Sequence, residues 1–149
     1  MSEEIPAVGE LQIGKTYSRP ALHDRYGGNR YTAISPCADH PYVFVFTKPS
    51  RGEWSHEFRG ETFVYTGEGT EGDMEMTGGN EAIRTHSQAG REIHVFDTLE
   101  NDDISYLGAF ECRDWFRTQL PDKNGEQREA IRFELEPAPK IGQVEWVDL

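Results

Sequence analysis

Short runs of apolar residues alternate with turn-forming residues along most of the chain. The runs have strand length and recur at intervals of about 8 to 12 residues, a spacing typical of β-barrels and β-sandwiches. The expected strands are Tyr31–Ser35, Tyr42–Thr47, Thr62–Thr66, Glu92–Asp97, Ile104–Asp114 and Ala130–Glu136, with a possible extra edge strand at Val144–Val147. The pattern predicts a curled, mostly antiparallel sheet.

Two segments carry the end signals of short helices. Arg19–Gly27 has Pro20 near its start, where a missing amide is tolerated, and a glycine at its end. The second segment is Gly79–Ala89, with Asn80 as its expected N-terminal cap. Together with the strands, these segments predict an α+β fold, in which a mostly antiparallel β-barrel is flanked by two short helices.

The length of 149 residues suits one domain with its own core. We expect a tail over residues 1–10, the domain over 11–136, and a linker with the possible edge strand over 137–149. No apolar run approaches the roughly 20 residues that a membrane span needs. The N-terminal residues contain no signal-peptide pattern. We therefore expect an intracellular, cytoplasmic protein without a membrane partner.

Acidic residues outnumber basic ones, with 27 Asp and Glu against 15 Lys and Arg, which gives a formal net charge of -12. Such a surface suits a high-salt cytoplasm, where charges are screened within about 3 Å at 1 M salt. A halophilic source is one hypothesis, and an ordinary acidic protein is the other. The negative charge also opposes binding to DNA, so a DNA-binding face would need a local patch of arginines.

The residues of common catalytic and metal sites do not occur at the required spacings. The histidines form no HxH or HExxH pair, the serines lie in no GxSxG turn, and the glycine-rich loops lack a following Gly-Lys-Ser/Thr. Cys37 and Cys112 form no CxxC pair, and we expect both to be reduced, although a disulfide between them stays open. We predict no metal, no cofactor and no catalytic residue. A small hydrolase using His56, Glu57 and Asp73 is the weakest alternative.

Three glycine-bearing segments stand out, because each leaves a strand or helix and contains an aromatic or ionisable residue. They are Tyr26–Arg30, Phe63–Gly69 and Gly72–Ile83. Backbone can approach a ligand closely at glycine. Each segment taken alone could be an ordinary turn, but the three together predict a shared pocket.

The second and third segments resemble the signature of SRA domains, in the residues Phe63-x-Tyr65-Thr66-Gly67-x-Gly69 and Met76-Thr77-x-x-Asn80-x-Ala82-Ile83. SRA domains are PUA-like modules that recognise 5-methylcytosine by flipping it out of the duplex. The longer pattern, which begins at His23-Asp-x-Tyr-Gly-Gly-x-Arg30, is similar to the SRA-like domain of McrA-type, modification-dependent HNH restriction endonucleases. The resemblance spans about residues 20–136 and implies a curled β-barrel that holds one extruded base.

The resemblance implies that Tyr65 stacks on the flipped base, with a second aromatic residue and a carboxylate close by. We assign Trp54 to the second aromatic position and Glu57 to the carboxylate, while His56 or Glu53 could hold the polar role instead. A carboxylate can accept a hydrogen bond from the cytosine N4 amine, where thymine presents an acceptor. These residues define the expected base pocket.

Other residues complete the expected site. Thr66 and Gly67 would form a recess for the 5-methyl group, and Asp73 either fixes its own loop or lines the pocket. The DNA-penetrating insertion of the eukaryotic domains is absent between Gly69 and Met76, which leaves open what fills the vacated base position. The expected contacts to the DNA backbone, or within the duplex, are Tyr26, Gly28, Asn29, Arg30 and Arg84.

The predicted function is a stand-alone reader of modified cytosine, either 5-methylcytosine or 5-hydroxymethylcytosine, in double-stranded DNA. Residues 115–149 contain no HNH arrangement, so the chain is not expected to be an enzyme. A restriction or defence system would then supply a separately encoded nuclease as partner. The alternative is a PUA-like RNA-binding or protein-interaction module without modified-base recognition.

Overall fold

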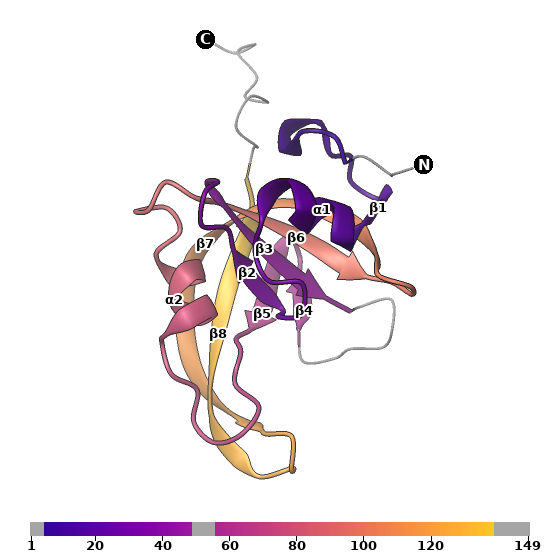
Figure 1. The fold of residues 1–149 in the computed structure, drawn as a ribbon. Helices are drawn as coiled ribbons and strands as arrows, with labels where there is room; N and C mark the ends of the chain where they lie inside the picture. Colours follow the sequence, from indigo (N-terminus) through magenta and orange to yellow (C-terminus); the bar gives the residue numbers. More distant parts are fainter. Residues whose placement is uncertain (1–4, 49–55, 139–149) are drawn as a thin grey trace.

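The computed structural model describes residues 5–48 and 56–138. The elements of this part follow one another along the chain as shown in Figure 1. They are η1 (Val8–Glu10), β1 (Thr16–Ser18), α1 (Arg19–Tyr26), β2 (Ile34–Pro36), β3 (Tyr42–Thr47), β4 (Glu57–Arg59), β5 (Thr62–Thr66), α2 (Gly78–Arg84), β6 (Glu92–Thr98), β7 (Asp103–Pro121) and β8 (Gln127–Pro137).

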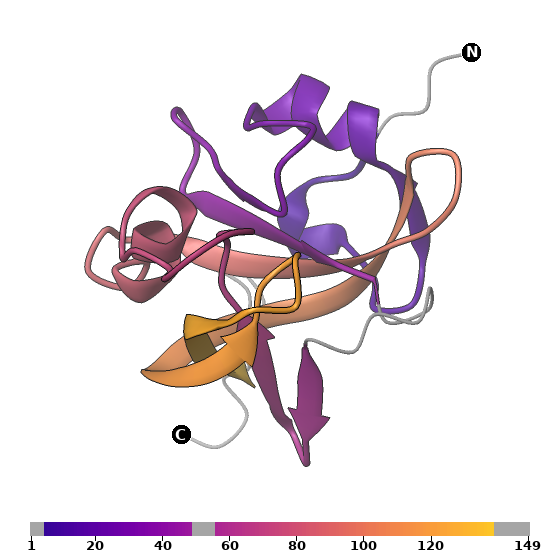
Figure 2. The ribbon, with the colours of Figure 1, turned by 90° about the horizontal axis from the view of Figure 1, so that it is seen from below.

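The strands form one bent sheet in the order β2-β3-β6-β7-β8-β5-β4, with β1 paired to β7 outside this path. All pairs are antiparallel except β3 and β6, which are parallel. The predicted α+β class, with its mostly antiparallel sheet and two short helices, is confirmed. Among the described residues no pairing joins the β2 edge to the β4 edge, so the expected closure into a barrel is not seen (Figure 2).

The two faces of β3 belong to different parts of the core. Val43 and Val45 lie in a cluster that includes residues of α2, β5 and β8. Phe44 and Phe46 lie in a second cluster with α1 and η1. Because both faces are covered, this strand has an unbroken apolar run rather than a strict alternation. The N-terminal Ile5 belongs to the second cluster and is buried.

Helix α1 begins and ends at the positions that its sequence predicts. The Ser18 hydroxyl accepts a hydrogen bond from the Ala21 amide at 3.3 Å and caps the first turn. At the other end, Gly27 has φ +81° and donates its amide to the His23 carbonyl at 2.8 Å. Helix α2 is shorter than expected, because the helix ends at Arg84 and turns follow it.

Strands β7 and β8 form a hairpin that is longer than the sequence predicts. Strand β7 continues past a bulge between Cys112 and Asp114 and reaches Pro121, which pairs with Gln127. In Figure 1 this hairpin extends beyond α2. Its far half contains many exposed polar residues, because only one side contacts the core, and the apolar pattern there is weak. The strands β1 and β4 are also unforeseen, and Val144–Val147 lies outside the described residues.

The two cysteines are free thiols, with Cys37 buried and Cys112 half-buried. Burial raises the pKa of each thiol to about 11. We expect both to react with iodoacetamide at pH 8 roughly a hundredfold more slowly than an exposed thiol, since the thiolate is the nucleophile. Mass spectrometry of the native and the urea-unfolded protein measures this, and equal labelling rates in the two states would contradict the burial of both thiols.

Candidate functional site

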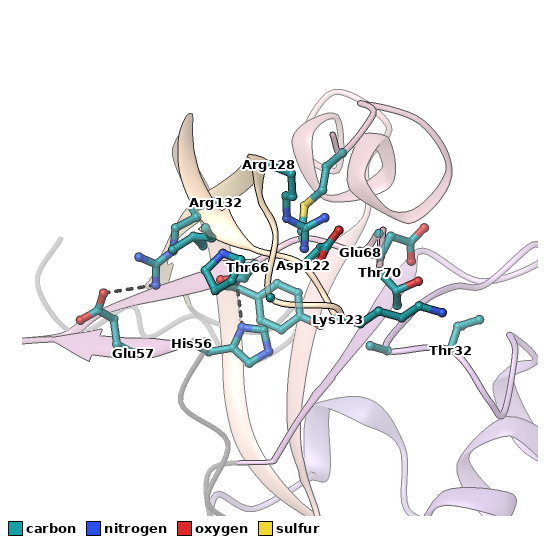
Figure 3. A pocket seen from close by; sticks show the side chains of 18 residues that line it. Thr32, His56, Glu57, Thr66, Glu68, Thr70, Asp122, Lys123, Arg128 and Arg132 are labelled. Carbon is teal, nitrogen blue, oxygen red and sulfur yellow. Dashed lines mark hydrogen bonds and ion pairs between the residues drawn. The ribbon is translucent and has the colours of Figure 1, made fainter. Parts of the chain in front are cut away.

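A cavity of about 920 Å³ opens beside the end of β5. Its walls come from residues 32–33, 56–57 and 65–70, from Met74, from the tip of the β7–β8 hairpin, and from Arg128 and Arg132 of β8. Figure 3 shows these side chains gathered around the space. The volume lies within the range of small-molecule sites, about 300 to 1,000 Å³, and therefore accommodates a planar ring with its substituents.

Two stacked rings lie at one side of the cavity. Tyr65 is only 1% exposed and donates its hydroxyl to the Phe46 carbonyl at 3.2 Å. The half-buried His56 ring lies on the Tyr65 ring, with centroids 4.2 Å apart and an interplanar angle of 9°. The Nδ1 atom of His56 accepts the Thr66 amide at 2.9 Å, so the neutral ring carries its proton on Nε2. The more accessible ring of the pair is therefore the imidazole.

Helix α2 fixes the glycine-bearing turn that follows β5. The Asn80 amide is 1% exposed; its Oδ1 accepts the Glu68 amide at 2.8 Å, and its Nδ2 donates to the Glu68 and Glu75 carbonyls. A Cβ on Gly67 would lie 2.5 Å from Asn80 Oδ1, so only glycine fits there. The Glu68 carboxylate accepts the Gly79 amide at 3.0 Å. The expectation that Asn80 caps α2 is wrong, because its side chain holds the turn instead.

Two carboxylates at the cavity already accept hydrogen bonds from neighbouring groups. Glu57 Oε1 accepts from Arg59 at 2.8 Å and lies 3.2 Å from an Arg132 nitrogen. The hydrogen bond from Arg59 is the main cause that holds the pKa of the Glu57 carboxyl below its usual value. Asp122 Oδ1 accepts the Asn124 amide at 2.8 Å, and this bond likewise lowers the pKa of Asp122. Both groups are ionised at neutral pH.

The cavity also has basic residues, although the chain is acidic overall. Arg128 is buried and donates to the Gly72 carbonyl at 2.7 Å. Lys123 extends from the hairpin tip, where its Nζ lies 3.4 Å from a Glu71 oxygen. With the buried Arg132, these residues place three cations at the cavity, beside the carboxylates of Glu57, Glu68 and Asp122.

Several of the expected pocket residues border this cavity. Thr66 and Gly67 line it together with His56, Glu57 and Tyr65. Trp54 lies outside the described residues. Asp73 does not line the cavity in the described part of the chain; its Oδ1 accepts the Glu129 amide at 2.7 Å and ties its loop to β8.

The residues expected to contact DNA lie mainly outside the cavity. Tyr26 is buried, and its hydroxyl accepts the Val8 amide at 3.1 Å, so its ring belongs to the core. Arg30 pairs with Asp24, and Arg84 pairs with Glu81 at 3.5 Å. Both arginines are on the surface.

Gly28 and Asn29 lie in the loop that precedes β2. Gly28 has φ +87°, and a Cβ there would lie 2.5 Å from Ser35 Oγ. The Asn29 amide donates to the same hydroxyl at 2.7 Å. These two residues shape the loop whose following residues, 32–33, reach the cavity.

Some residues at this site belong to none of the motifs in the sequence. Arg128 and Arg132 had an available signal, since two-residue alternation through Ala130 places all three on one face of a strand. Lys123 lies in a segment that looks like an ordinary polar loop. Tyr31, 91% exposed and next to residues 32–33, was expected to begin a strand and instead lies in the loop before β2.

The described residues contain no group of three or more His, Cys, Asp or Glu side chains arranged to hold a metal ion. None of the helices in residues 5–48 and 56–138 has both the length and the apolar character of a membrane span.

Comparison with known proteins gives a family and several solved structures of the same fold. The family model described as "ScoMcrA-like, SRA domain" matches residues 13–148. The sulfur binding domain and SRA domain of ScoMcrA, complexed with phosphorothioated DNA, match at 20% identity and a TM-score of 0.70, over 92% of this chain and 43% of that chain. The present sequence thus spans less than half the length of that ScoMcrA chain.

Two other structures match at lower identity. The SUVH5 SRA domain in complex with hemi-methylated CG DNA is 15% identical at a TM-score of 0.64, over 97% of this chain and all of that one. The DNA recognition domain of the cytosine modification-dependent restriction endonuclease LpnPI is 14% identical at a TM-score of 0.65, over 84% of this chain and 72% of that one. These likenesses concern the fold. No curated protein sequence matches.

Proposed function

Because the chain belongs to the family of ScoMcrA-like SRA domains, we propose that it reads modified cytosine in double-stranded DNA by flipping the base into the cavity beside β5. The modification is 5-methylcytosine or 5-hydroxymethylcytosine. Structures of the same fold include the SUVH5 SRA domain bound to hemi-methylated and to fully hydroxymethylated CG DNA. The DNA-binding site of this chain is then the cavity lined by Tyr65, His56, Thr66 and Gly67.

The observation that carries this proposal is the pair of stacked rings in an open cavity. Extruding a base costs a few kcal/mol of pairing and stacking. Stacking on a protein ring recovers roughly 1–3 kcal/mol per base. With centroids 4.2 Å apart, the His56 and Tyr65 rings leave no room for a base between them. The base therefore stacks outside this pair, on the imidazole side, with Tyr65 behind the imidazole.

The polar groups beside the rings suit the edge of a cytosine. Arg59 and Arg132 both contact Oε1 of Glu57, so the other carboxylate oxygen can accept from the cytosine N4 amine. The His56 Nε2–H is a donor for the O2 or N3 acceptor of the same base. Thymine presents an acceptor where cytosine has its amine, and would meet a carboxylate there. The expected selectivity is for cytosine over thymine.

We also propose that this chain supplies recognition while a separate nuclease supplies cleavage, as part of a restriction or defence system. LpnPI, whose DNA recognition domain shares the fold, is a cytosine modification-dependent restriction endonuclease. In this arrangement the purified chain binds a modified duplex without cutting it. Cleavage of that duplex by the chain alone, with divalent cations present, would show that it carries a nuclease of its own.

The test of the proposed function is the affinity for matched duplexes that differ only at C5 of one cytosine. We expect the methylated or the hydroxymethylated duplex to bind about fourfold or more tightly than the unmodified one, because burying one methyl group contributes about 0.8 kcal/mol. Fluorescence polarisation at 0.1 M and 1 M KCl measures the affinities and their salt dependence. Equal affinity for all three duplexes would remove the modified-base proposal, and tighter binding of a matched RNA would favour an RNA-binding module.

A further inference from the structure

Tyr31 is the most exposed of the large hydrophobic side chains in the described part of the protein. It is 91% exposed, against 74% for Ile13 and 52% for Phe58. Its position is at the rim of the cavity, because the next two residues, Thr32 and Ala33, line it. At the mouth of the cavity, such a ring is placed to contact a molecule that binds there.

The loop that carries Tyr31 is held in one shape by its own hydrogen bonds. The Tyr31 amide donates to Asn29 Oδ1 at 2.7 Å, and the Asn29 amide donates to Ser35 Oγ at 2.7 Å. The Thr32 hydroxyl donates to the Ile34 carbonyl at 2.9 Å. These bonds pair polar groups on both sides of Tyr31, while the Tyr31 side chain itself stays exposed.

Arg19 of α1 supports the same loop from beneath. Its Nη2 donates to the Asn29 and Thr32 carbonyls, at 3.0 Å and 2.7 Å, and so brackets Tyr31. The guanidinium lies 3.6 Å from the centroid of the Phe46 ring. Burial lowers the pKa of Arg19 to about 10, which leaves it charged at neutral pH. The loop is thus anchored to the core through a cation.

The neighbouring side chains of the loop are engaged elsewhere. Arg30 is in an ion pair with Asp24, and the Asn29 side chain accepts the Tyr31 amide. Within residues 5–48 and 56–138, the Tyr31 side chain makes no hydrogen bond and no contact with another aromatic ring. Of the loop residues 29–31, Tyr31 is therefore the one whose side chain can enter another molecule without breaking a contact.

We propose that Tyr31 enters the duplex at the position that the flipped base vacates. The inference rests on the proposed function, and it replaces Arg30 and Asn29 as candidates for insertion. Apolar side chains that wedge between base pairs stabilise an opened or kinked duplex. An aromatic ring stacks on the neighbouring bases and so offsets part of the stacking that extrusion removes. The rigid loop presents that ring without a further loss of backbone freedom.

The experiment compares the wild-type protein with Tyr31→Ala and Tyr31→Phe on two duplexes. Both carry one 5-methylcytosine, placed opposite guanine in the first and opposite adenine in the second. Because a mismatched base is easier to extrude, the wedge matters less on the second duplex. We expect Tyr31→Ala to weaken binding roughly tenfold on the matched duplex and less than about threefold on the mismatched one. Tyr31→Phe keeps the ring and stays close to wild type on both.

Ile13→Ala is the matched control, because it removes another exposed apolar side chain that borders a different cleft. Unchanged binding by Tyr31→Ala on the matched duplex overturns the inference. An equal loss on both duplexes also overturns it, since that result describes a surface contact. An unmodified duplex is measured alongside: if the wild type binds it as tightly as the modified one, the proposed function fails. If the wild type prefers the modified duplex and Tyr31→Ala binds the matched duplex as tightly as the wild type, only the inference about Tyr31 fails.

Discussion

His56→Ala will weaken binding to a 5-methylcytosine duplex by roughly 5- to 150-fold, the range that corresponds to the loss of one base-stacking contact. The imidazole lies at 4.2 Å on Tyr65 and lines the cavity. Removing it deprives the base of its platform and of the Nε2–H donor. Among the described contacts, the folded state loses the hydrogen bond from the Thr66 amide, which stabilises it by about 1 kcal/mol.

Polarisation assays on modified and unmodified duplexes, with melting curves for each variant, measure the two effects separately. His40→Ala is the control, because His40 also stacks on a tyrosine, Tyr42, and does not line the cavity. His56→Phe restores a flat ring without the donor, so an intermediate affinity is expected. If His56→Ala binds modified DNA as tightly as the wild type, the base does not stack at this position.

Asn80→Ala will lower the free energy of unfolding by about 3 to 5 kcal/mol. Its side chain makes three hydrogen bonds to the backbone of Glu68 and Glu75 in a site that is 1% exposed. Each group that loses its partner there contributes a penalty of about 1 to 3 kcal/mol. In a chain of this length the melting temperature should fall by about 10 °C. The turn over Gly67 also loses its support, so the affinity for modified DNA falls with the stability.

Thermal and urea unfolding, followed by circular dichroism, measure the change. Asn124→Ala is the matched control, since its side chain is exposed and donates only to Glu71 at 3.2 Å. We expect its effect to stay within about 0.5 kcal/mol. If both variants lose a similar free energy of unfolding, the three hydrogen bonds of the Asn80 side chain stabilise the fold no more than an average surface contact does.

The sequence was informative wherever the local pattern had a single physical cause. Strand β3 was predicted with its observed ends, because five of its six residues are apolar or aromatic and turns flank it. Helix α1 was placed correctly through Pro20 and Gly27, whose effects act within one turn. The fold family followed from the spacing of the glycine motif around Tyr65, a long-range pattern rather than a local propensity.

The parts that were missed depend on contacts between distant segments. The far half of the hairpin is held by pairing between β7 and β8, so its polar sequence gives little apolar signal. Asn80 looked like a helix cap, and only the approach of the turn at Glu68 reveals its other partners. The stacking of His56 on Tyr65 joins the residue that precedes β4 to β5, and no local pattern in either segment encodes it.

The construction of the cavity from distant segments has a thermodynamic consequence. The walls of the cavity come from segments that begin near Thr32 and end at Arg132, a separation of about one hundred residues along the chain. No single hairpin or helix carries the walls by itself, so opening of any one segment abolishes the binding surface. A ligand that occupies it draws its affinity from the intact molecule and, by mass action, raises the resistance of the whole domain to heat. Recognition and cooperative folding are thus coupled in one equilibrium.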